Sequence, residues 1–252
     1  MPYIYYLYIF PADPLVPKPD WPPLRAQLLR SGLLQEKIGG TAPEYDFDRF
    51  WGDIRRDRHL QHVKIPVHNI RSLGQLVQNL IAFGVVPPGF QSGHEATSIP
   101  DLAASLRAGG FVSTDFALSF EEEFEIGPSF DKFCDGALEH REAVISYRDE
   151  GNGVGIYCGV DLLDPPVIPG TERVAEGAFE FIDRWFEDPL AKWIDPETGR
   201  GYGLLDFDWE NTLGAGRCCL AIRYPGRLNP LKIAALLEEI AGRPFRFSFC
   251  SY

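Results

Sequence analysis

The spacing of apolar residues follows a helical period through most of the first half of the chain. Apolar positions recur at helical spacing in four stretches, residues 23–34, 41–59, 72–83 and 100–106. Ser72 and Gly84 bracket the third stretch as start and stop signals, and Pro100 suits the first turn of the fourth. The pattern therefore predicts a helix-rich segment between residues 20 and 135.

Runs rich in β-branched and aromatic residues predict strands, most of them in the second half. We expect strands at residues 3–10, 63–67, 142–148, 154–160, 217–224 and 245–252, and one more helix at 171–186. The glycine-rich turn at 149–153 predicts a hairpin between the third and fourth of these strands. The turn at 195–199 predicts a second hairpin that extends to Trp209.

The last 36 residues carry the clearest local signals. Asn229 is a good N-cap, Pro230 suits the first helical position and Gly242 suits the end, so residues 231–241 are expected to be helical between two strands. We predict an α+β fold with a mixed, mainly antiparallel sheet, a C-terminal β-α-β unit and covering helices from the helix-rich middle segment. Residues 1–252 form a single globular domain in this interpretation. The alternative is two lobes, a helix-rich 1–135 and a strand-rich 136–252.

Charge is distributed unevenly along the chain. The formal net charge is −12, and residues 101–200 alone contain 22 Asp and Glu against 8 Lys and Arg. A protein that binds nucleic acid without regard to sequence needs a basic face, so this class is excluded. The acidity is compatible with a basic protein partner, with a cation, or with a well-solvated surface.

The sequence shows no membrane span and no export signal. No uncharged run approaches the roughly 20 residues of a membrane helix, and the apolar stretch at 2–10 lacks basic residues before it. Five cysteines, an odd number, favour reduced thiols, and together these features favour a cytoplasmic protein.

Four glutamates, Glu121, Glu122, Glu123 and Glu125, form the densest acidic cluster. Ser119 followed by Glu122 matches a capping box, which predicts the start of a helix. The functional interpretation is a partner-binding patch for a basic protein, with Phe120 and Phe124 interleaved. The two interpretations are compatible with each other.

Alternation of acidic and apolar residues at 205–210 is the strongest candidate for metal chemistry. On a strand, Asp206, Asp208 and Glu210 would lie on one face at about 7 Å spacing. Such a face could bind Mg²⁺ or Ca²⁺, or supply an acid and a base. The competing interpretation, which we favour, is a half-buried strand with a solvated acidic face. A divalent cation is the only cofactor considered, and none is predicted.

Other motifs have stronger structural explanations. His59, His62 and His68 have metal-like spacing, but basic residues surround them. Cys134 has His140 nearby, yet acidic neighbours oppose a thiolate. Adjacent Cys218 and Cys219 would point to opposite faces of a strand. The glycine clusters at 151–155 and 214–216 precede strands, so no helix N-terminus awaits a phosphate there.

Three classes of function remain at this stage. The first is a non-enzymatic acidic binding protein that engages or neutralises a basic protein partner, as immunity proteins that block toxins do. The second is a metal-dependent hydrolase that uses Asp206, Asp208 and Glu210. The third is a structural or assembly subunit whose acidity serves solubility. We rank them in this order.

Overall fold

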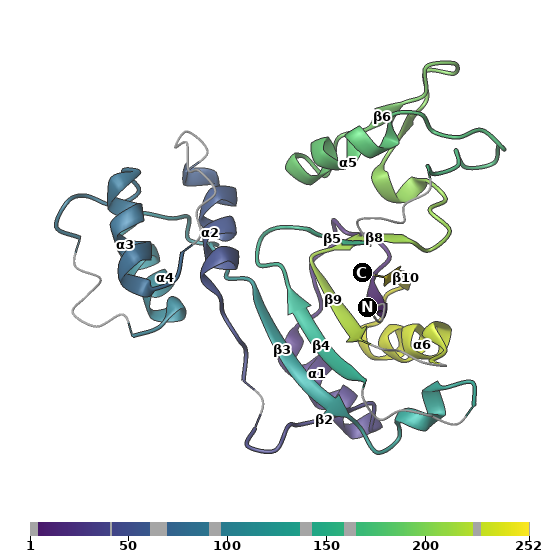
Figure 1. Cartoon of the computed structure of the whole chain (residues 1–252), viewed down its shortest axis with the longest axis horizontal. Coiled ribbons are helices and arrows are strands. Elements are labelled where there is room, and N and C mark those ends of the chain that lie inside the picture. Colours follow the sequence, from purple (N-terminus) through teal and green to yellow (C-terminus); the bar gives the residue numbers. More distant parts are fainter. Residues whose placement is uncertain are drawn as a thin grey trace. The chain divides into compact units, whose positions relative to one another are not determined.

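The computed structural model describes residues 5–40, 42–60, 70–90, 97–136, 143–158, 165–223 and 228–251. The strand expected at 63–67, His62, His68 and His140 lie outside these ranges. The chain divides into two compact units (Figure 1). Unit 1 comprises residues 1–41, 123–147 and 154–252, and unit 2 comprises residues 42–122 and 148–153. The chain passes between the units after residues 41, 122, 147 and 153.

A six-stranded, mainly antiparallel sheet is the largest element, and the fold is α+β as predicted. Its strand order is β10-β1-β9-β4-β3-β2. The bounds of these strands are β1 (Tyr5–Pro11), β2 (Leu34–Gln35), β3 (Phe120–Ile126), β4 (Val144–Asp149), β9 (Cys218–Arg223) and β10 (Phe245–Ser251). Two short two-stranded sheets, β5 (Gly155–Cys158) with β8 (Leu213–Gly216) and β6 (Trp193–Ile194) with β7 (Gly201–Tyr202), complete the strands of the described residues.

The C-terminal β-α-β unit is present, with a third strand between its two strands. Because β1 pairs antiparallel with both β9 and β10, these two strands run parallel to each other on either side of it. Helix α6 (Pro230–Ala241) connects them. The Asn229 side chain accepts hydrogen bonds from the first-turn amides, and Gly242 ends the helix in the left-handed conformation, as the sequence predicts.

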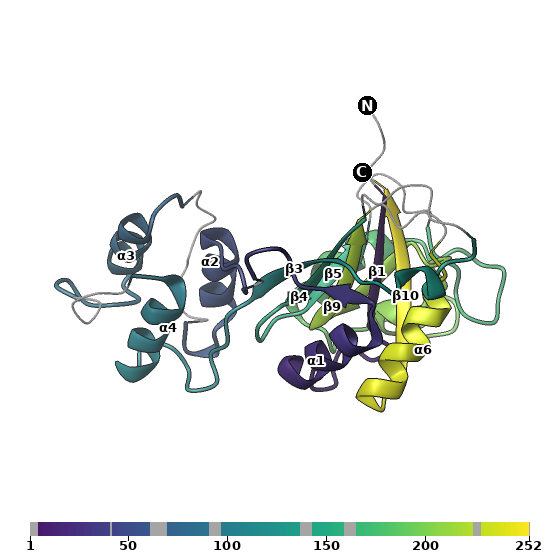
Figure 2. The ribbon, with the colours of Figure 1, turned by 90° about the horizontal axis from the view of Figure 1, so that it is seen from below.

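Helices α1 (Trp21–Ser31) and α6 cover one face of the sheet in unit 1 (Figure 2). Leu24 and Leu28 of α1 meet Leu237 of α6 above Ile9 of β1. On the opposite face, Tyr8 and Phe10 pack against Tyr157 of β5. A further core surrounds α5 (Ala178–Glu187), β6, β7 and β8. The sheet is therefore covered on both faces around β1.

Unit 2 is mainly helical. It contains α2 (Phe47–Arg56), α3 (Leu73–Ala82), α4 (Ile99–Ala108) and the 3₁₀ turn Arg58–Leu60. Their apolar faces share one core, to which α2 contributes Phe50, Trp51 and Ile54. Ser72 and Ser98 cap α3 and α4 through their side chains. The helix-rich segment predicted from periodicity is confirmed, although α2 is shorter than the expected 41–59.

Several local expectations are wrong. β4 and β5 do not form a hairpin, since β4 lies between β9 and β3 while β5 pairs with β8. The turn at 149–153 does exist, closed by a hydrogen bond from Gly153 N to Glu150 O. The hairpin at 195–199 is confirmed as β6–β7, but it ends at Tyr202. Helix α5 begins at Ala178 and not at 171, because Val174 forms an isolated bridge with Val167 and Gly177, at positive φ, is the N-cap.

Candidate protein-binding surface

The glutamate cluster at 121–125 lies on a strand, so the expected helix start after Ser119 is wrong. Ser119 instead donates its N–H and Oγ–H to the buried carboxylate of Asp53, at 2.7 and 3.0 Å. Ser119 is itself buried, and both of its donors are therefore used within unit 2. Ser119 and Glu122 match the spacing of a capping box, but the Ser119 hydroxyl donates to Asp53 and caps no helix.

Three of the four glutamates have roles inside the molecule. Glu121 accepts from Arg49 at 2.5 Å and from Arg148 at 3.1 Å. Glu122 is 2 % exposed, and Glu123 forms an ion pair with Lys37. Only Glu125 of this set is exposed. The partner-binding role of this cluster stays a prediction, but most of its negative charge is balanced or buried within the fold.

Asp206, Asp208 and Glu210 do not share the face of a strand. Asp206 ends the 3₁₀ turn Leu204–Asp206, and its Oδ2 accepts from Gly203 N at 2.7 Å. Asp208 forms an isolated bridge with Val167, and its Oδ1 accepts from Glu210 N at 2.9 Å. No group of three or more His, Cys, Asp and Glu residues suited to a metal ion occurs in the described part of the chain.

Glu210 and Asn211 occupy a tight turn that the alternating pattern did not indicate. Thr212 N donates to Trp209 O at 2.8 Å, and the two residues between have φ values of 50° and 60°. This is the backbone of a type I′ turn, which ordinarily selects Asn and Gly. Asn211 fits that preference and Glu210 does not. The sequence therefore carries only half of the Asn-Gly pattern by which such a turn is predicted. The turn returns the chain into β8, which ends any strand before it.

The cysteines form no disulfide among themselves, and all five belong to the described residues. Burial raises the pKa of the Cys134 thiol, which opposes thiolate formation and therefore nucleophilic chemistry. Its Sγ–H donates to Phe130 O at 3.6 Å. Cys134 thus has the surroundings of a structural thiol.

Exposed acidic and apolar side chains lie together on α5. The buried face of this helix places Ala178, Phe181 and Trp185 in a core of unit 1. Its outer face carries Phe179 and Phe186, seven residues apart and therefore aligned, and Leu190 follows just after the helix. These three side chains are 37, 46 and 73 % exposed. Helical spacing over the expected helix 171–186 places Phe179 inward with Val174 and Ile182, and this prediction is wrong for Phe179.

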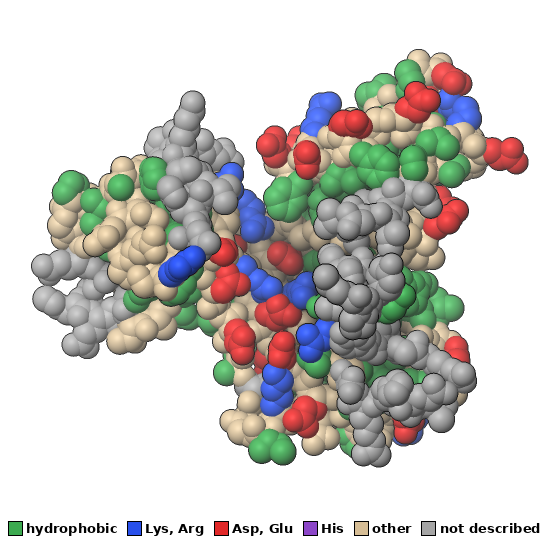
Figure 3. All heavy atoms as spheres, viewed as in Figure 1, with side chains coloured by type: hydrophobic (Ala, Val, Ile, Leu, Met, Phe, Trp, Pro, Cys, Tyr) green, Lys and Arg blue, Asp and Glu red, His purple; other side chains and the backbone are tan. Residues whose placement is uncertain are grey.

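Carboxylates border this apolar stripe. Asp183 lies between Phe179 and Phe186 at helical spacing, while Glu180 and Glu187 occupy the adjacent face, and all three are exposed. Figure 3 shows hydrophobic side chains gathered along α5 with acidic ones beside them. We call these six residues the α5 surface: Phe179, Glu180, Asp183, Phe186, Glu187 and Leu190.

The hairpin next to α5 is held by a carboxylate that is nearly inaccessible to solvent. Asp195 accepts from Arg173 Nη2 at 2.6 Å, from Thr198 Oγ1 at 2.6 Å and from Glu197 N at 3.0 Å. The hydrogen bond from Arg173 is the main reason that the pKa of Asp195 lies well below its usual range. Asp195 is thereby fixed as an anion and stabilises the β6–β7 turn.

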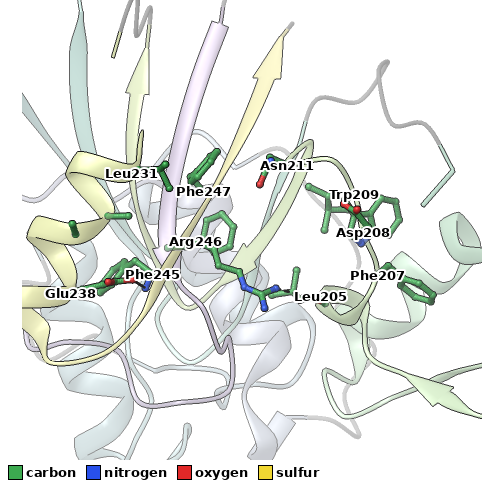
Figure 4. A pocket seen from close by; sticks show the side chains of 14 residues that line it. Leu205, Phe207, Asp208, Trp209, Asn211, Leu231, Glu238, Phe245, Arg246 and Phe247 are labelled. Atoms are coloured by element: carbon green, nitrogen blue, oxygen red, sulfur yellow. Dashed lines mark hydrogen bonds between the residues drawn. The ribbon is translucent and has the colours of Figure 1, made fainter. Parts of the chain in front are cut away.

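A pocket of about 390 Å³ lies between α6 and residues 205–213, at the edge strand β10 (Figure 4). Of the expected metal ligands, only Asp208 lines it. Trp209 is part of its wall and also contacts Phe179 of the α5 surface, with ring centroids 6.1 Å apart. The pocket and the α5 surface therefore adjoin within unit 1.

The chain was compared with protein-family models, with curated proteins and with solved structures, and none of the three comparisons gave a match. In the described residues, no helix combines the length and apolar character needed to cross a membrane.

Proposed function

We propose that this chain is a non-enzymatic acidic binding protein that engages a basic protein partner through the α5 surface. The observation that carries the proposal is the stripe formed by Phe179, Phe186 and Leu190, exposed to solvent and bordered by Glu180, Asp183 and Glu187. Aromatic side chains are enriched at interfaces, where they provide much of the binding energy.

Charge supports the choice of a basic partner. The chain carries a net charge of −12, and the α5 surface belongs to the strongly acidic segment 101–200. Complementary charge accelerates association and selects partners, while buried apolar contacts slow dissociation. Fast and durable capture is what an inhibitor or immunity protein requires, so neutralisation of the partner is the proposed outcome of binding.

A paired set of variants tests the proposal. The partner captured by the wild-type chain from its native extract is purified, and its affinity is measured for each variant. Phe186→Ser combined with Leu190→Ser should weaken binding by about 100-fold, because it removes two of the three apolar side chains of the stripe. Ile38→Ser is the matched control, since Ile38 is 97 % exposed and lies outside the α5 surface.

The contribution of charge to binding is tested on the same complex. Raising NaCl from about 0.05 M to about 0.5 M should weaken binding by screening the exposed carboxylates. Equal affinity of the Phe186/Leu190 double variant and the wild type would refute the proposal. An acidic partner, or an affinity that does not respond to salt, would refute the electrostatic part of it.

A further inference from the structure

β10 is an edge strand of the six-stranded sheet, and part of its outer edge opens into the pocket between α6 and residues 205–213. Its register with β1 is continuous from Tyr5↔Ser251 to Pro11↔Phe245. In an antiparallel pair, every second residue directs both its N–H and its C=O away from the neighbouring strand. Once one residue of β10 is known to direct its N–H and C=O outward, every second residue from it must do the same.

Phe249 fixes which residues of β10 face outward. Its N–H donates to Asn211 O at 2.7 Å and not to β1. By alternation, Phe247 and Phe245 face outward as well, which agrees with the pairing of Phe245 opposite Pro11, a residue without an N–H. Phe245 N donates to the carboxylate of Glu238 at 2.9 Å. By the same alternation the N–H and C=O of Phe247 do not bond to β1, and neither forms a backbone hydrogen bond to the rest of the described chain.

The open stretch of edge is short and closed at both ends. Asn211 covers the edge at Phe249, held there by a turn in which Glu210 and Asn211 both have positive φ. This conformation costs Glu210 about 1–2 kcal/mol, whereas asparagine adopts it readily. Glu238 covers the edge at Phe245. The gap at Phe247 is thus bounded by specific contacts, one of which requires a strained backbone.

The walls of the pocket combine apolar and charged groups. Ten of its 14 lining residues are apolar, including Leu231 of α6, which is 66 % exposed. Its charged residues are Asp208, Glu238 and Arg246, and Arg246 is directed to Leu205 O at 3.1 Å. Figure 4 shows α6 with Leu231 and Glu238 on one side of β10 and residues 205–211 on the other. Acidic side chains therefore flank an apolar centre.

We infer that this pocket binds an extended segment of the basic partner by strand addition, with one residue of that segment hydrogen-bonded to the N–H and C=O of Phe247. The inference rests on the proposed function, because the pocket adjoins the α5 surface through Trp209 and Phe179. Strand addition takes its affinity from main-chain hydrogen bonds and its specificity from side-chain pockets. The segment that fits has an apolar residue at its centre and Lys or Arg on either side.

The test uses a defined peptide and its backbone-modified twin. Acetylated and amidated Gly-Lys-Lys-Val-Lys-Lys-Gly is titrated into the full chain, followed by the same peptide with the valine nitrogen methylated. Methylation removes the donor to Phe247 O and leaves every charge in place, so binding should weaken by about tenfold or more. A twin with Glu in place of each Lys should not bind.

A matched pair of variants probes the same contact from the protein side. Phe247→Pro removes the N–H that faces outward and spares the ladder to β1, whereas Phe247→Leu keeps the N–H and an apolar side chain. The proline variant should bind the valine peptide about tenfold more weakly than the leucine variant. Circular dichroism and thermal melting establish that both variants are folded, and the methylated peptide needs no variant at all.

The outcomes separate the inference from the function on which it rests. If the partner tolerates Phe247→Pro but is lost on Phe186→Ser with Leu190→Ser, the pocket inference is refuted and the proposed function stands. Equal binding of the two peptides, or binding by neither of them, refutes strand addition. A homodimer of the wild-type chain in light scattering that is lost in Phe247→Pro would assign this edge to a second copy and also refute it.

Discussion

Two acidic regions of this molecule carry similar charge but use it in opposite ways. On β3, Glu121 and Glu123 are ion-paired with basic side chains and Glu122 is buried. On the α5 surface, Glu180, Asp183 and Glu187 are exposed beside apolar groups. The first set is ion-paired or buried within the fold, and the second is exposed to solvent. Density of charge in a sequence therefore does not reveal whether that charge is accessible.

Reversing the charge of a paired glutamate on β3 should have the largest effect, a loss of stability. Glu121→Lys places a third cation beside Arg49 and Arg148 and removes their common acceptor. We expect the free energy of unfolding to fall by about 3 kcal/mol, since the three side chains are mostly buried. Urea denaturation of the full chain measures it. A loss no greater than that of an ordinary surface substitution would mean that β3 and α5 do not differ in this respect.

Reversal of charge on α5 should have the converse effect. Glu180→Lys combined with Glu187→Lys should weaken capture of the basic partner by about tenfold, through lost attraction and added repulsion. Stability should stay within about 0.5 kcal/mol of the wild type, because both side chains are exposed. Affinity and urea denaturation are measured on the same preparation. A large loss of stability would show that these acids serve the fold after all.

Asp53 extends the comparison to a buried carboxylate. Burial is the main cause that raises its pKa to about 6, against the lowering effect of the hydrogen bond from Ser119 N. The folded state thus retains a proton that the unfolded state releases from about pH 4, so stability rises as the pH falls from about 7 to 5. The gain from this group is about 1 kcal/mol. Unfolding measured across this range should lose that component in Asp53→Asn.

Glu125 should give the smallest effect. It is the exposed member of the β3 cluster, and Glu125→Lys should alter the free energy of unfolding by less than about 0.5 kcal/mol. If α5 is the binding surface, affinity for the partner should also be unchanged. A marked loss of affinity with retained stability would return the binding role to β3.

The elements with self-contained signals could be predicted from sequence, and those fixed by distant partners could not. Asn229, Pro230 and Gly242 delimit α6 through contacts within a few residues. The pattern at 205–210 resembles a strand, yet Asp208 pairs with Val167 and the Trp209 indole donates to Leu204 O at 2.8 Å. The alternation arises because Phe207 and Trp209 are buried in a core. An irregular segment can bury alternate residues as well as a strand can.

The candidate site could be predicted only in part, because its contacts also involve residues distant in the sequence. The acidity of residues 101–200 follows directly from the sequence, but the sequence does not show that Arg49 and Arg148 converge on Glu121. The exposure of Phe179 was missed because the expected helix began at 171 with Val174 inward, whereas Val174 pairs with Val167 and the helix begins only after Gly177. The open edge at Phe247 depends on β1, whose place in the sheet no local pattern encodes.

The position of β1 has a consequence for how this protein is made. Tyr6 pairs with Arg223 on one side and with Cys250 on the other. Both neighbouring strands are synthesised more than two hundred residues after β1, so β1 cannot pair before then. Unit 2, built largely from contacts within residues 42–122, meets no such delay. Long-range pairings close slowly because the intervening chain must be ordered first. An aromatic strand therefore stays unpaired during much of translation, a period in which a chaperone would protect it.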